Sequence, residues 1–373
     1  MVAPKGSSFA RDAHRRKVQL VVGGELAETG RWALGELRNV LESRGWIVQE
    51  CDELESGSAI IVGLAESPVI QEVLAKACMD LPNAPESLVI KWLGPDTLIA
   101  AGRDLRGLVY ALTELARAIE LSLGDADPFA EVIETVESPE MTWRSMQLFL
   151  CNADLEREWY YRESFWEEYL SQLARCRYNN FSLTVGHQTS YMSPPYPFHV
   201  ELPEFPKVWV PGLSQNERQR NLEMLRRISK MAQERGLHFT LGVWSQHDSG
   251  YGPPMVEGLD EDIRAECNAL GLQKLLEACP AIDGVQFRMN RESGVPEDEQ
   301  LEYYEAQFRA IAECGRQIRL DIRAKGLSNQ TIERARGIVD NTVVSTKFWC
   351  EHLGQPYVMP ELQSADINNY RRY

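Results

Sequence analysis

The 373-residue sequence lacks several features by which common classes of protein are recognised. No apolar run approaches the ~18–20 residues of a membrane-spanning helix, so we expect a soluble protein. The basic start, residues 1–17, is not followed by an apolar segment, so we expect no signal peptide there. Acidic residues outnumber basic ones by 55 to 39, and the net charge of −16 argues against nucleic acid or a membrane surface as the partner.

The eight cysteines are scattered, with no C-x-x-C pair and no cysteine–histidine cluster at zinc spacing. Several of them fall on apolar helix faces, where a free thiol packs as a small hydrophobic group. This use of cysteine favours a reducing compartment over an oxidising one. We therefore expect a cytoplasmic protein.

What is present is a globular composition, 44% hydrophobic and 25% charged, over a length that favours two domains. We expect a flexible N-terminus over residues 1–17 and a small α/β domain over 18–121. Residues 122–140 are acidic, contain two prolines, and are typical of a linker between domains.

From residue 141 onward the pattern changes to strands alternating with helices, which predicts parallel βα units. The expected strands are Ser145–Leu150, Asn180–Val185, His238–Trp244, Gly284–Met289, Ile318–Ile322 and Thr342–Phe348. No glycine-rich phosphate loop follows the first strand, so a (β/α)₈ TIM-type barrel over 141–373 fits better than a doubly wound sheet. Only about six units are visible, so we expect an incomplete barrel, a fragment of a longer enzyme.

Alternation along each strand predicts which side chains face the barrel interior, because apolar residues pack outward against the helices. On this basis the interior receives Gln286, Arg288, Asn290, Arg319, Asp321, Arg323, Ser345, Lys347 and Trp349, with Thr240, Gly242, Trp244 and Gln246 from the third strand. Arginines and a lysine in a protein of net charge −16 favour an anionic ligand, such as a uronic acid carboxylate. The alternative is that Arg319 and Asp321 simply pair with each other at the barrel floor.

Glu292 follows the fourth strand, where TIM barrels place catalytic groups. A carboxylic acid there suits general-acid work on a glycosidic oxygen, and the alternative is an ordinary loop glutamate. Glycoside hydrolysis normally requires a second carboxylate, for which Glu351 and Asp321 are the candidates.

Side chains that suit sugar binding surround these strand ends. Trp244 and Trp349 offer flat faces for a pyranose ring, and Arg288, Arg323 and Lys347 offer cations for a uronate. The polar side chains expected to bind hydroxyl groups are Asn152, His187, Gln188, His247 and Asn290. For each of these residues a structural role is an equal alternative. Residues 191–198, YMSPPYPF, are expected to form a proline-stiffened wall of the cleft.

Two stretches carry a family resemblance. The first joins VQLVVGGE, AIIVGLAESP and AGRDLRGLVYALTELARAI, and resembles the small domain that precedes the barrel in α-glucuronidases and β-hexosaminidases. The second, MTWRSMQLFL followed by FWEEYLSQLARCRYNNFSLTVGH, resembles the first βα units of the same enzymes. The α-glucuronidase type implies an inverting glycosidase of polysaccharide degradation that uses no metal and no cofactor. The resemblance also implies a glutamate as the general acid, which we match to Glu292.

The sequence also departs from these families. The adjacent Asp-Glu pair of β-hexosaminidases is absent, because Arg291 precedes Glu292, and no clear match exists for the inverting base of α-glucuronidases. Two other functions therefore stay open. One is a non-catalytic or truncated glycan-binding relative. The other is a metal-dependent sugar isomerase or epimerase with His247, Glu292 and Asp321 as ligands.

Overall fold

The computed structural model describes residues 16–55, 57–123, 128–186, 189, 191–246, 255–289, 293–324 and 327–345. The chain divides into two compact units. The first unit comprises Met1–Arg144 with Glu168–Asn179 and Ala232–Leu237, and the second comprises Ser145–Glu167, Asn180–Met231 and His238–Tyr373. Within the described residues, no helix has the length and apolar character needed to cross a membrane.

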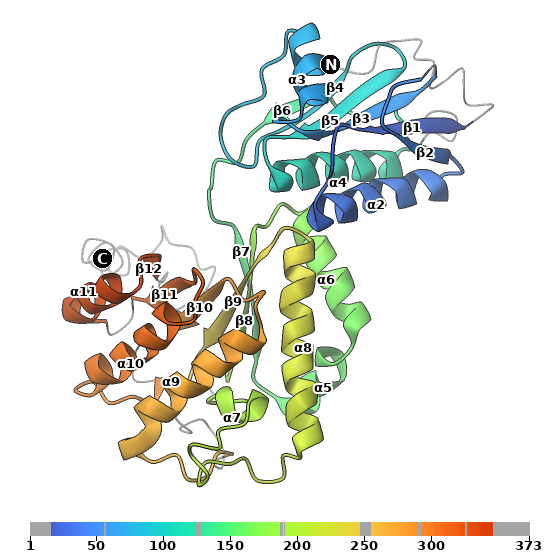
Figure 1. Ribbon diagram of the computed structural model, residues 1–373. Coiled ribbons are helices and arrows are strands. Elements are labelled where there is room, and N and C mark those ends of the chain that lie inside the picture. Colours follow the sequence, from blue (N-terminus) through green and yellow to red (C-terminus); the bar gives the residue numbers. More distant parts are fainter. Residues whose placement is uncertain are drawn as a thin grey trace, which may run out of the picture. The chain divides into compact units, whose positions relative to one another are not determined.

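A six-stranded sheet forms the centre of the first unit (Figure 1). Its strands are β1 (Lys17–Val22), β2 (Ile47–Cys51), β3 (Ala59–Leu64), β4 (Leu88–Trp92), β5 (Thr97–Gly102) and β6 (Thr135–Glu137). The spatial order is β2-β1-β3-β5-β4-β6, with β4 antiparallel to both of its neighbours. The sequence pattern predicts strands at 18–22, 46–49, 59–62, 88–92 and 97–101, and helices over 28–44 and about 105–121. The predicted strands match β1 to β5, whereas β6 lies inside the segment expected to be only a linker.

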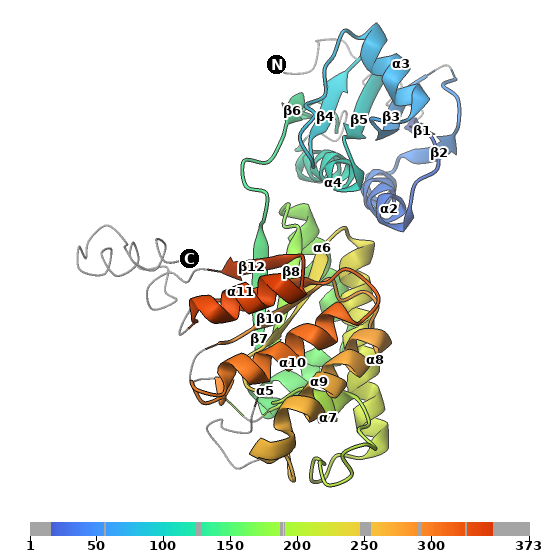
Figure 2. The same cartoon turned by 60° about the vertical axis from the view of Figure 1, so that its left-hand side comes forward.

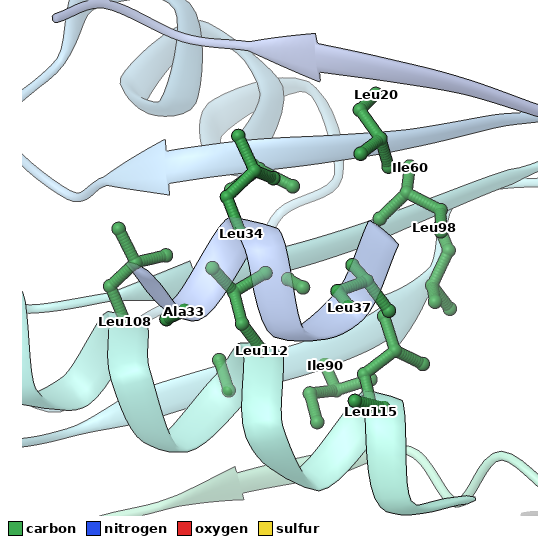
Figure 3. Close-up of a cluster of buried hydrophobic side chains, with 14 of the residues drawn as sticks. Leu20, Ala33, Leu34, Leu37, Ile60, Ile90, Leu98, Leu108, Leu112 and Leu115 are labelled. Atoms are coloured by element: carbon green, nitrogen blue, oxygen red, sulfur yellow. The ribbon is translucent and has the colours of Figure 1, made fainter. Parts of the chain in front are cut away.

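Helices cover both faces of this sheet. Helices α2 (Glu28–Ser43) and α4 (Leu105–Leu121) share one core with the sheet, in which Leu34, Leu37, Leu112 and Leu115 are buried (Figure 3). Helix α3 (Pro68–Lys76) supplies Ile70 and Leu74 to a second, smaller core on the opposite face. Burial on both faces explains why the parallel strands read as nearly continuous apolar runs.

The junction between β5 and α4 is the tightest part of the first unit. A Cβ atom added to Gly102 would lie 1.9 Å from the backbone nitrogen of Leu108, and one added to Gly107 would lie 2.1 Å from the carbonyl oxygen of Ser87. Asp104 caps α4 by accepting a hydrogen bond from the Gly107 amide at 2.9 Å. The glycines are therefore needed for close backbone approach, which explains their presence in the stretch AGRDLRGL.

The second unit contains six parallel strands. These are β7 (Ser145–Leu150), β8 (Asn180–Val185), β9 (His238–Val243), β10 (Gly284–Phe287), β11 (Arg319–Arg323) and β12 (Thr342–Ser345). Their spatial order, β12-β11-β10-β9-β8-β7, follows the chain, and every neighbouring pair is parallel. A doubly wound sheet would reverse its order at a switch point. The expected class, an α/β unit plus a TIM-type barrel region of about six βα steps, is confirmed.

Seven helices follow these strands among the described residues. They are α5 (Ala153–Tyr160), α6 (Glu163–Arg175), α7 (Tyr196–His199), α8 (Gln215–Glu234), α9 (Glu261–Ala278), α10 (Gln300–Ala312) and α11 (Asn329–Ile338). Helices α9, α10 and α11 lie side by side along the outside of the strands (Figure 2). Sequence periodicity predicts helices near 164–177, 216–235, 260–278, 298–315 and 329–339, which match the five longer helices. It does not indicate α5 and α7, which contain eight and four residues.

The seven cysteines within the described residues are all free thiols. Cys267 and Cys279 are buried, and burial raises the pKa of their thiols to about 11 and about 12. Both thiols are therefore protonated at neutral pH and act as small packing groups.

Candidate functional site

A row of polar side chains crosses the inner face of the six-stranded sheet in the second unit. Gln147 on β7 donates to the Gln286 side chain on β10 at 3.1 Å, and Gln286 donates to Asp321 on β11 at 2.9 Å. Ser345 on β12 donates to the other Asp321 oxygen at 2.5 Å. The row places Gln286, Asp321 and Ser345 on the inner face, in agreement with the orientation expected from alternation.

A second polar layer lies closer to the amino ends of the strands. Thr240 donates to Asn180 at 2.9 Å, and Asn180 donates to Ser145 at 2.7 Å. Burial lowers the pKa of the Arg319 guanidinium, and the charge of Asp321 opposes this effect. TIM barrels usually fill this space with bulky aliphatic residues, so a polar interior favours a ligand-binding role.

Arg288 lies just beyond the carboxyl end of β10, and its guanidinium carbon is 3.4 Å from the centroid of the Trp244 ring. The indole in turn meets Phe149 edge to face, with ring centroids 5.9 Å apart. Arg288 and Trp244 are 3% and 2% exposed, so stacking fixes a buried cation in one orientation. Trp244 therefore supports the arginine in this structure, and one face of its ring is occupied by Arg288 instead of being open to a sugar.

Gln246 is a correction to the sequence interpretation, which placed its side chain in the barrel interior. Its side-chain oxygen accepts hydrogen bonds from the hydroxyls of Tyr196 and Tyr303, at 3.2 and 2.9 Å. Tyr303 belongs to α10, so the side chain points toward the helices. Alternation fails here because β9 ends at Val243, three residues earlier.

The same buried network anchors the chain on both sides of residues 290–292. The Gln246 amide donates to the carbonyl of Ser293 at 2.8 Å, and the Tyr304 hydroxyl donates to the carbonyl of Arg288 at 2.6 Å. Asn268 on α9 donates to the Gln246 carbonyl at 2.8 Å. No sequence pattern indicates these supports, because tyrosine and asparagine on helices resemble ordinary packing residues there.

The predicted site residues divide into two groups. Asp321, Arg288, Arg323, Trp244 and Asn152 are described. The others, Glu292, Glu351, Asn290, Lys347, His247, Trp349 and His187, lie outside the described residues. Of the described group, Asp321, Arg288 and Trp244 come from neighbouring strands of one sheet and share its inner face or its carboxyl edge.

Asn152 has a structural role, which the sequence analysis gave as the alternative to sugar binding. Its side-chain oxygen accepts hydrogen bonds from the amides of Asp154 and Leu155, at 2.9 and 3.2 Å, and so caps α5. The described part of the chain contains no group of three metal-ligating side chains. Asp321, one of the ligands considered from the sequence, accepts its hydrogen bonds from an amide and a hydroxyl.

Residues 191–198 contribute to the interior as well as to a cavity wall. Tyr196 and Phe198 are buried, and a Cβ atom on Gly271 of α9 would lie 2.5 Å from the Tyr196 Cβ. Tyr191, Met192 and Phe198 line a cavity in the second unit. His199, at the end of α7, is fully enclosed, and its Nδ1 lies 2.7 Å from the carbonyl oxygen of Pro195.

Burial of His199 makes the stability of the protein depend on pH. Burial lowers the pKa of His199 to about 4, below its ordinary value of 6.5. The unfolded chain therefore binds a proton between these values while the folded chain does not, and stability falls as pH drops from about 6.5 toward 4. Urea unfolding at pH 7.5 and 5.0 should show a loss of about 2 kcal/mol from this group.

The matched variant is His199→Asn, whose amide can replace the contact to Pro195 but does not titrate. We expect its stability to change less between the two pH values than that of the wild type. An identical pH dependence in both proteins would rule out His199 as the responsible group.

Comparison with solved structures identifies the architecture. The chain is similar to a GH138 enzyme targeting pectin rhamnogalacturonan II, at 17% identity and a TM-score of 0.69 over 91% of this chain. It is also similar to the GH20 β-N-acetylhexosaminidase from Streptomyces coelicolor A3(2), at 13% identity, a TM-score of 0.58 and 95% coverage. The chain has the fold of these glycoside hydrolases.

A third similar structure is CpGH84D, at 11% identity, a TM-score of 0.56 and 89% coverage of this chain. The chain spans 39% of the length of the GH138 enzyme, 69% of the GH20 enzyme and 52% of CpGH84D. No protein-family profile and no curated protein matches the sequence. The expected resemblance is thus supported at the level of glycoside hydrolase fold, and the α-glucuronidase type remains a prediction.

Proposed function

We propose that this chain is the barrel-bearing part of a glycoside hydrolase that cleaves a uronic-acid-containing glycan, with Glu292 as the general acid. The observation that carries the proposal is the Arg288 guanidinium, stacked on Trp244 at the carboxyl edge of a polar barrel interior. A rigid, buried guanidinium is well suited to a carboxylate, because it can donate two parallel hydrogen bonds. The glycosidase fold of the similar structures supports the same interpretation.

The chemistry follows from two carboxyl groups on either side of the glycosidic bond. Glu292 would protonate the leaving oxygen, and a second carboxylate would activate water or attack the sugar directly. Asp321 and Glu351 are the candidates for this second group. Arg288, Arg323 and Lys347 would bind the uronate, while Asn290, His187 and His247 would bind hydroxyls. One of the similar enzymes targets a pectin, which is consistent with polysaccharide degradation.

We also propose that the protein works in a reducing compartment such as the cytoplasm. All seven described cysteines are free, including Cys78 and Cys176, which are exposed. Exposed thiols in a secreted protein would be open to oxidation.

The proposal is tested with pairs of aryl glycosides that differ only in a carboxylate or a hydroxymethyl group on the sugar. The wild type should prefer the uronoside. In Arg288→Gln, the preference should fall by roughly 30-fold or more, because removing one partner of a buried charge pair costs about 2–5 kcal/mol.

Two further variants sharpen this test. Arg288→Lys keeps the charge but loses the planar fork, so it should restore only part of the preference. Arg309→Gln is the control, since Arg309 is an exposed residue of α10 whose partner is Glu305. A folded wild-type protein that turns over neither member of any pair would overturn the proposed activity and favour glycan binding without hydrolysis.

A further inference from the structure

A cavity of about 180 Å³ lies in the second unit, outside the polar interior of the barrel. Its lining comes from the segments that follow β7, β8 and β9, namely helix α5 and Tyr161, residues 191–221, and Met255. Since the strands are parallel, these segments all start from their carboxyl edge, which is also where Arg288 lies. Figure 1 shows α5 and α7 at this end of the strands. The cavity therefore shares the face on which substrate is expected.

Aromatic side chains form part of the walls of this cavity. Tyr161 is held by a hydrogen bond from its hydroxyl to Asn221, which is itself 3% exposed. The guanidinium of Arg220 stacks on the same ring, 4.0 Å from its centroid. Tyr191 forms part of the same wall. Aromatic rings fixed in this way offer apolar surface to the C–H faces of a sugar while their hydroxyls remain polar.

The rim of the cavity carries a donor and an acceptor with little net charge. Arg157 on α5 donates to Glu217 on α8 at 2.9 Å. Glu217 also caps α8, because its other oxygen accepts from the amide and the hydroxyl of Ser214 at 3.2 and 2.9 Å. The hydrogen bond from the Ser214 backbone amide is the main contribution that lowers the pKa of Glu217, so the carboxylate stays charged. Paired charges of this kind suit neutral hydroxyl groups better than a second carboxylate.

The opposite wall is built by two loops that are tied together. Trp209 and Glu257 exchange backbone hydrogen bonds of 3.1 and 2.8 Å, next to lining residues Val210 and Met255. A Cβ atom on Gly258 would lie 1.9 Å from the Lys207 carbonyl oxygen, and the φ of Gly258 is +75°. Such close backbone approach holds these two loops together, which favours a wall that needs little rearrangement on binding.

From this cavity we infer a second sugar-binding subsite, which receives a neutral sugar unit of the same glycan whose uronic acid residue lies at Arg288. This inference rests on the proposed function and extends it from one sugar residue to an oligosaccharide. The cavity is smaller than the roughly 300–1,000 Å³ of sites for drug-sized ligands, which fits a single sugar ring.

The experiment compares two uronosides, an aryl glucuronide and a glucuronosyl-xylotriose, in the wild type and in two variants. Arg157→Ala removes the rim donor and should lower kcat/KM for the oligosaccharide about tenfold, because a hydrogen bond from a charged group is lost; this factor corresponds to about 1.4 kcal/mol. The aryl glucuronide, which has no sugar for this subsite, should be turned over as before. Arg162→Ala is the matched control, because Arg162 is an exposed neighbour outside the cavity lining.

Tyr161→Ala removes the aromatic wall and should show the same selective loss. Equal losses on both substrates, or no loss on the oligosaccharide, would overturn the subsite. If the wild type hydrolyses neither substrate, the proposed activity fails, and calorimetry decides the subsite separately. Xylotriose should then bind the wild type and the Arg162→Ala control, and bind Arg157→Ala about tenfold more weakly. Equal binding, or none, would overturn the subsite.

Discussion

Replacing Glu292 by glutamine should lower the turnover of a natural uronoside by about 10²–10⁴-fold, the usual contribution of a general acid. Glutamine keeps the size and most hydrogen bonds of the side chain but cannot give a proton to the leaving oxygen. The chain on both sides of this position is anchored, through Tyr304 to the Arg288 carbonyl and through the Gln246 amide to Ser293.

The leaving group separates loss of proton donation from general damage. A dinitrophenolate leaves without help from an acid, whereas a sugar alcohol requires protonation. Glu292→Gln should therefore retain most of its activity on a dinitrophenyl uronoside while losing it on the glycan. Glu297→Gln, an exposed glutamate of the same segment, serves as the control and should behave as the wild type. Equal losses on both substrates would show that Glu292 is not the acid.

The largest effect on stability is expected from Gly102→Ala. The added methyl group would lie 1.9 Å from the Leu108 nitrogen and 2.4 Å from the Gly107 carbonyl carbon. Both are backbone atoms of helix α4, so no rotamer change can relieve the overlap, and the helix itself must move from its core. We expect the free energy of unfolding to fall by about 3 kcal/mol, the upper end for overpacked positions.

The matched control is Gly35→Ala in helix α2. A Cβ atom on Gly35 meets no atom within 4 Å, so alanine there should stabilise the protein by about 0.5–1 kcal/mol through its better helix propensity. Urea unfolding of the two variants should therefore move in opposite directions from the wild type. If Gly102→Ala unfolds within about 0.5 kcal/mol of the wild type, the β5–α4 junction is looser than its geometry indicates.

The sequence predicted long periodic elements well and short ones poorly. Helix α4 was recognisable because its apolar residues repeat over 17 residues, whereas α5 exposes Leu155 and depends on a cap from Asn152. Strand alternation correctly oriented Gln286 and Asp321, which lie within regular strands. It failed at Gln246, because a residue beyond the end of a strand is oriented by its contacts and not by the pleat.

The support of the site could not be predicted, since it is made by partners that are distant in sequence. Gln246 is bound by Tyr196 from α7 and by Tyr303 from α10, and no local pattern encodes such a meeting. Arg288 was predicted as a uronate ligand from its strand position. Its stacking on Trp244 depends on the register of β9 against β10, and the periodicity of a single strand does not predict that register.

The polar row across the inner face also has a consequence for folding. Gln147 and Gln286 are 139 residues apart in the chain, yet they share a hydrogen bond, and the row continues to Ser345 on the last described strand. Contacts of such long sequence separation form slowly, because loop closure must precede them. A nascent chain that has produced only β7 to β9 has only Gln147 of this row and lacks Arg288, the residue proposed to bind the uronate. Ligand affinity should thus appear late and abruptly during refolding, making it a sensitive reporter of the completed native state.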